Sequence, residues 1–171
     1  MRRILIAGIG NVFHGDDAFG VAVVRELGRR HWPDSVEVVD FGIRAYDLAY
    51  ALTDGYDTIV LVDAAPRGLA PGTVQLLEPE LPGLEPLDGA IVDAHALNPV
   101  SALHMARALG GPKGRILLVG CEPARLESED GHLGLSQPVQ AAVARAVAMI
   151  ASLVQDFLGG LPTTNPGLVP T

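Results

Sequence analysis

The sequence predicts an α/β fold with a mainly parallel sheet, because apolar strands alternate with amphipathic helices along most of the chain. The first strand, residues 3–8, is a nearly continuous apolar run, as expected of a strand that helices cover on both faces. A glycine-rich turn follows, and two aspartates stand where the first helix begins. This succession of strand, turn and helix is typical of a site at the carboxyl end of a strand.

The other elements follow the same alternation. Further strands are predicted at 36–41, 58–63, 72–77 and 115–119, and helices at 17–30, 46–52, 98–110 and from 136 to 159. The connection between strands 58–63 and 72–77 is too short for a crossover helix, so strand 72–77 is predicted to be antiparallel and at an edge. Residues 78–94, where proline and glycine recur, are predicted to form a surface loop.

Length and composition indicate one compact domain. The chain has 171 residues, of which 49% are hydrophobic, enough for a substantial core. We expect this domain to span residues 1–158, and the aperiodic, proline-containing residues 159–171 to form a mobile tail. Cys121 is the single cysteine, which excludes an intramolecular disulfide and a metal cluster built from cysteines.

The charge balance limits the classes of partner. A net charge of -8 and a pI near 4.9 argue against binding to nucleic acid or to an anionic membrane. No apolar stretch approaches the roughly 20 residues that a membrane span needs. We therefore expect a cytoplasmic protein without a nucleic-acid or membrane partner, whose charge permits a cation or a basic peptide as ligand.

The glycine-rich turn does not fit a dinucleotide site. Position 13 is phenylalanine where the G-x-G-x-x-G pattern requires glycine, and the carboxylates of Asp16 and Asp17 would repel a pyrophosphate. No dinucleotide is therefore expected. Glycines 8, 10 and 15 are expected to let the backbone turn tightly and to leave room for a protein substrate.

Three residues form a candidate metal-contacting and catalytic set. Asp17 follows the first strand, Asp63 ends the third, and His95 lies in the loop before the helix that starts at Asn98. Two carboxylates and an imidazole suit a divalent ion such as nickel or zinc. Carboxylates can also act as general base, and the chain has neither a G-x-S-x-G nucleophile motif nor an H-E-x-x-H motif.

Each of these residues also has a purely structural interpretation. Asp16 or Asp17 could cap the helix that follows, and of the two Asp16 is the better candidate for the cap. Asp63 could end its strand in a turn, and His95 could be an ordinary loop residue. His14 competes with His95, because it lies inside the opening loop itself.

Four segments of the chain resemble one known family. They are GIGNVFHGDDAFGV in the first loop, VDAA at Asp63, AHALNP around His95, and VGCEPARLE followed by GLS before the last helix. Their order and spacing are similar to those of the hydrogenase maturation endopeptidases. That resemblance implies a three-layer α/β/α sandwich with a five-stranded mixed sheet in the order 2-1-3-5-4, strand 4 being antiparallel.

The resemblance also implies a function. Members of this family trim the C-terminus of the large-subunit precursor of nickel-iron hydrogenases, and Asp17, Asp63 and His95 match the residues that contact the metal. The nickel is carried by the substrate and is not permanently bound, and cleavage follows its insertion. Two alternatives stay open: a zinc hydrolase with the same three residues as permanent ligands, and a nickel-binding maturation chaperone that does not cleave.

Overall fold

The computed structural model describes residues 1–79, 99–126, 133–159 and 169–170. Strands and helices alternate along these residues as predicted. The elements in chain order are β1 (Ile4–Ile9), the short 3₁₀ helix η1 (Gly15–Ala18), α1 (Phe19–Leu27), β2 (Val36–Gly42), α2 (Ala45–Thr53), β3 (Thr58–Ala64), β4 (Val74–Glu78), α3 (Pro99–Ala108), β5 (Arg115–Cys121), α4 (Gln137–Gly159) and β6 (Val169–Pro170).

The strands form one sheet in the order β2-β1-β3-β5-β4-β6. Strands β2, β1, β3 and β5 are parallel to one another, and β4 runs antiparallel to β5, with Leu76 opposite Val119. The predicted five-strand order and the antiparallel strand are thus confirmed. The two residues of β6 pair with the end of β4. The rest of the predicted mobile tail, residues 160–168 and 171, lies outside the described residues.

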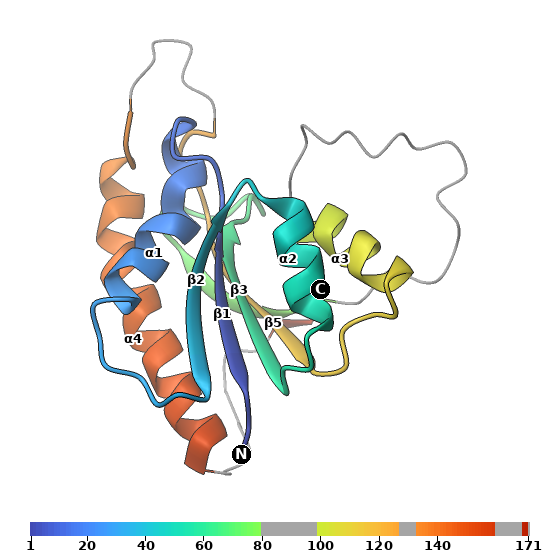
Figure 1. Ribbon diagram of the computed structural model, residues 1–171. Coiled ribbons are helices and arrows are strands. Elements are labelled where there is room, and N and C mark those ends of the chain that lie inside the picture. The colour runs from blue at the N-terminus through green and yellow to red at the C-terminus, as the bar shows by residue number, and fades with distance from the viewer. Residues whose placement is uncertain (80–98, 127–132, 160–168, 171) are drawn as a thin grey trace.

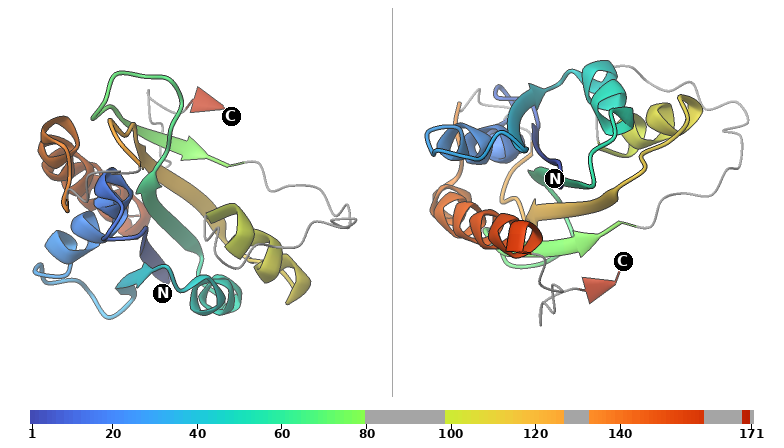
Figure 2. Two further views of the ribbon diagram at one scale, coloured as in Figure 1. Left: turned by 90° about the horizontal axis from the view of Figure 1, so that it is seen from above. Right: turned by 60° about the horizontal axis from the view of Figure 1, so that its bottom comes forward.

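Helices cover both faces of the sheet (Figure 1). Alternate residues of β1 and β3 pack against α1 and α4 on one face, Ile6 and Val60 among them. The intervening residues pack against α2 and α3 on the other face, as Leu5 and Ile59 do. The two views of Figure 2 show these two helical layers from above and from below. Strand β3 lies between β1 and β5, and is therefore central, as predicted.

Helix α4 is the longest helix in the described part of the chain. By length and composition it could cross a membrane. Here it packs along the sheet with nine buried side chains, including Val139, Ile150 and Phe157. The apolar side chains that recur every three to four residues along this helix therefore form a core face.

Two glycines allow α1 to approach the sheet very closely. A Cβ on Gly20 would lie 2.0 Å from the carbonyl oxygen of Val62 and 2.3 Å from that of Ile9. A Cβ on Gly8 would lie 2.4 Å from a methyl carbon of Val24. The expectation that the glycines leave room for a substrate is wrong at Gly8, since the protein's own helix fills that space.

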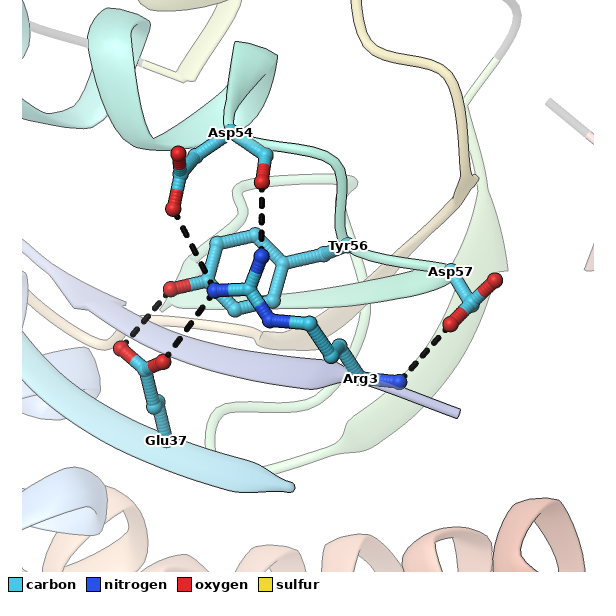
Figure 3. A network of polar contacts seen from close by, with 5 residues as sticks. All are labelled: Arg3, Glu37, Asp54, Tyr56 and Asp57. Carbon is cyan, nitrogen blue, oxygen red and sulfur yellow. Dashed lines mark hydrogen bonds and ion pairs between the residues drawn. The ribbon is translucent and has the colours of Figure 1, made fainter. Parts of the chain in front are cut away.

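The amino-terminal edge of the sheet carries a polar network around Arg3 (Figure 3). The guanidinium Nη2 of Arg3 lies 3.4 Å from Glu37 Oε1 and 3.3 Å from Asp54 Oδ2. The Cζ carbon of Arg3 lies 4.4 Å from the centre of the Tyr56 ring. The Arg3 backbone N–H donates to Asp57, and the Tyr56 hydroxyl donates to Glu37 over 2.8 Å. The guanidinium of Arg3 thus forms ion pairs with two acids, Glu37 and Asp54, at this edge.

Candidate functional site

The candidate site lies at the carboxyl ends of β1 and β3. These strands are parallel neighbours, and the chain leaves β1 towards β2 on one side while β3 and β5 lie on the other. Such a reversal of strand order opens a crevice in which α/β proteins bind ligands. Asp63 is the last but one residue of β3, and η1, which carries Asp16 and Asp17, follows the loop after β1.

Asp17 is half-buried at this edge. Its Oδ2 accepts a hydrogen bond of 2.7 Å from the backbone N–H of Asn11, in the loop after β1. Neither η1 nor α1 has a side-chain cap, so the helix-capping interpretation of Asp16 and Asp17 is wrong for the helix that they precede. The Asp17 carboxylate is instead held by its own loop, and no hydrogen bond from the described residues reaches its other oxygen.

Asp63 is a buried acid close enough to Asp17 to be affected by its charge. Its side chain is 8% exposed, and Oδ1 accepts the N–H of Ala64 over 2.9 Å. Burial raises the pKa of Asp63 well above its ordinary value, and the negative charge of Asp17 raises it further, against the opposing effect of the Ala64 N–H. Among the described residues, no Lys, Arg or His forms an ion pair with either acid.

Asp16 is fully buried and binds elements far along the chain. Its Oδ2 accepts from the N–H groups of Ala124 and Arg125 and from the hydroxyl of Ser136, and Oδ1 accepts from the Ser136 N–H. Burial alone would raise the pKa of Asp16, but these four hydrogen bonds outweigh it and lower the pKa. Asp16 is therefore a stable buried anion at the start of α4, not a cap of α1.

The histidines are only partly placed. His95, the third residue of the predicted set, lies outside the described residues. His14 is exposed and directly precedes η1. Within the described ranges, no three His, Cys, Asp or Glu side chains group closely enough to hold a metal ion. The structure therefore brings Asp17 and Asp63 together and leaves the contribution of His95 as a prediction.

Sequence reasoning missed Glu122 at this edge. This acid follows β5, is 7% exposed, and its carboxylate accepts the N–H groups of Arg67 and Gly68 in the loop after β3. Glu122 therefore fixes the loop that follows Asp63 in the chain. A signal was present, because an acid directly after a buried strand stands where the neighbouring strand ends also lie.

A cleft of about 390 Å³ opens beside the first loop. Residues Gly10 to Phe13 form one wall, and the turn from Asp40 to Arg44 forms another. Phe13 and Ile43 are 70% and 52% exposed, unusual for large apolar side chains. Asn11 lines this cleft and its backbone N–H donates to Asp17, so the cleft adjoins the loop that holds Asp17.

Helices on both faces of a mixed sheet, with two interacting acids at the switch point and a cleft beside the loop after β1, define an α/β protein with an enzyme-like site. Comparison with known proteins names the class. A family model described as hydrogenase maturation protease matches residues 21–153. The chain belongs to this family and is therefore an endopeptidase.

Individual relatives agree with this assignment. The chain is 31% identical to the hydrogenase 2 maturation protease of Escherichia coli over 90% of this chain and 92% of that protein. It is 32% identical to the hydrogenase expression/formation protein HupM of Azotobacter chroococcum, over 96% and 77% respectively. The solved structure of the hydrogenase maturating endopeptidase HybD from E. coli superposes with a TM-score of 0.71 at 28% identity, over 90% of this chain and 93% of that one.

Proposed function

We propose that this endopeptidase removes the C-terminal extension of the large-subunit precursor of a nickel-iron hydrogenase after nickel insertion. The nickel in the precursor is the recognition element, and Asp17, Asp63 and His95 contact it. The observation that carries this proposal is the pair of coupled carboxylates, Asp17 and Asp63, which have no cationic partner within the described part of the chain. The electrostatic energy of two neighbouring carboxylates becomes more favourable when a divalent cation binds between them.

The position of His95 in the sequence supports its inclusion. It stands shortly before Pro99, where α3 begins, and α3 packs on the face of the sheet to which Leu61 also points. Because side chains alternate along a strand, Asp63 points to this same face. A residue that enters α3 can therefore reach the acid at the end of β3.

Hydrolysis needs a nucleophile and a base, and we assign both to this edge. A water molecule attacks the scissile carbonyl carbon while an aspartate accepts its proton, and the same proton passes to the leaving amine as the C–N bond breaks. We assign the base to Asp63, because its raised pKa gives it a greater affinity for the proton than an ordinary carboxylate has. The cleft beside Asn11 accommodates the peptide chain that flanks the scissile bond.

The test is incubation of the purified protein with nickel-loaded and nickel-free precursor, followed by mass measurement. We expect the precursor to lose its C-terminal peptide only when nickel is loaded. Cleavage of nickel-free precursor by protein that contains stoichiometric zinc would instead establish a resident-metal hydrolase. Stable binding to the loaded precursor without any change in its mass would establish a maturation chaperone.

A further inference from the structure

The buried carboxylate of Asp16 joins three distant parts of the chain. It lies in η1, and its four donors come from Ala124 and Arg125, just after β5, and from Ser136, just before α4. The separations along the sequence are 108 to 120 residues. The connection from β5 to α4 is therefore tied to the opening loop at both of its ends.

The bond to Ser136 places the negative charge at the start of α4. The Ser136 carbonyl accepts the first helical hydrogen bond, from Gln140 N over 2.8 Å, so Ser136 is the residue that begins this helix. A carboxylate at a helix N-terminus is stabilised by the helix dipole as well as by the N–H donors. Asp16 is thereby fixed to the most extensive helix of the described chain.

The hydrogen bonds of Asp16 also restrain the backbone of Asp17, because Asp17 is the next residue in the chain. The Asp16 N–H donates to Arg125 O over 3.0 Å, and the Asp17 N–H donates to His14 O over 3.1 Å. On the other side of Asp17, a Cβ on Gly10 would lie 1.8 Å from the Asp17 carbonyl oxygen, so the two backbones are in direct contact. The backbone of Asp17 is thus held between the loop after β1 and the anchor formed by Asp16.

We propose that Asp16 is a positioning residue, which acts through Asp17 by fixing the 3₁₀ turn that presents the Asp17 carboxylate beside Asp63. This inference rests on the proposed function for its consequence in catalysis, but not for its geometry. Residues that orient a metal-contacting group, without touching the metal, typically change affinity or activity by about 10- to 100-fold when altered.

The most informative variant is Asp16→Asn, which keeps the shape of the side chain. Both carboxylate oxygens of Asp16 accept hydrogen bonds, so the new amide nitrogen must face N–H or O–H donors whichever way it is turned. Ser136→Ala is a milder variant, since it removes the hydroxyl bond to Asp16 and keeps the backbone bond. Glu37→Gln is the control, because it weakens a carboxylate network at the opposite edge of the sheet.

Two measurements report the position of Asp17. The first is hydrogen exchange of the Asn11 amide, which is bonded to Asp17 Oδ2 and needs no substrate. The second is kcat and KM for nickel-loaded precursor. In Asp16→Asn we expect faster exchange at Asn11 and a fall in kcat of about 10- to 100-fold, with KM changed much less. Ser136→Ala should give a smaller change of the same kind, and Glu37→Gln neither.

The outcomes separate this inference from the proposed function. If Asn11 exchange and kcat in Asp16→Asn match those of Glu37→Gln, Asp16 has only a structural role and the inference is wrong. If the wild type does not process the precursor but Asn11 still exchanges faster in Asp16→Asn, the function fails and the positioning of Asp17 stands. Should Asp16→Asn not fold, Ser136→Ala decides in the same way.

Discussion

The two edges of the sheet treat their carboxylates in opposite ways. At the amino-terminal edge, Glu37 and Asp54 share the guanidinium of Arg3, which also stacks on Tyr56. At the carboxyl-terminal edge, Asp17 and Asp63 face each other without a cation from the described part of the chain. The first arrangement is satisfied by residues of the protein itself, and the second, under the proposed function, is completed by the nickel of the precursor.

This contrast teaches that similar residues are used for different purposes within one small domain. An acid with a hydrogen-bonded or ion-paired partner adds to stability, whereas a buried acid beside a like charge reduces it. Residues that lower stability in this way are frequent at functional sites, where a ligand supplies what is missing. The comparison can be tested at each edge in turn.

The largest effect is expected from the unpaired edge. Asp17→Asn and Asp63→Asn should each lower the rate of precursor processing by about 10²- to 10⁴-fold, the range that a positioned general base contributes. Because the Asp63 carboxylate is destabilised by burial and by Asp17, the folded state should not be weakened by Asp63→Asn. Mass measurement of the processed precursor checks the rate, and urea unfolding checks stability. Full activity of both variants would contradict the assigned site.

A second test addresses the close contact that supports this edge. Gly20→Ala should destabilise the protein by about 1–3 kcal/mol or more, because its Cβ would meet the backbone carbonyls of Val62 and Ile9. Gly159→Ala is the matched control, since a Cβ there meets nothing within 4 Å. Urea unfolding of both variants measures the difference. Equal stabilities would mean that α1 does not depend on this contact.

The pH dependence of stability gives a third test. The pKa of Asp63 is above its ordinary value of 3.8 in the folded protein, so the folded state holds this proton more tightly than the unfolded chain. Its contribution to stability is therefore complete below pH 3.8 and is lost as the pH rises through the folded pKa. We expect Asp63→Asn to gain stability over the wild type across that window. Thermal unfolding from pH 3 to 8 measures this, and parallel curves would refute it.

The smallest effect is expected at the paired edge. Tyr56→Phe removes the hydroxyl that donates to Glu37 and should cost about 1 kcal/mol of stability, with processing unchanged. Burial and, second to it, the hydrogen bond to Glu37 raise the pKa of Tyr56 to about 12. The hydroxyl therefore stays protonated, and the difference between the two proteins should persist up to high pH. A loss of processing in this variant would show that the two edges are not independent.

The sequence predicted what local patterns determine. Apolar runs and short connections were sufficient for the strands, and for the antiparallel orientation of β4, because both depend on neighbouring residues. The first helix was placed less well: residues 15–18 form η1, and α1 begins only at Phe19. The role of Asp16 could not be predicted, because its partners are more than 100 residues away and only folding brings them together.

The bond between Asp16 and Ser136 also sets an order of events during synthesis. A protein emerges from the ribosome with its N-terminus first, and contacts between distant residues must wait for the later one. The opening loop is made more than 100 residues before these donors, and among the described residues its buried anion has no donor until those after β5 have been made. A nascent chain that has not yet reached Ser136 therefore cannot form all of the hydrogen bonds that hold Asp16.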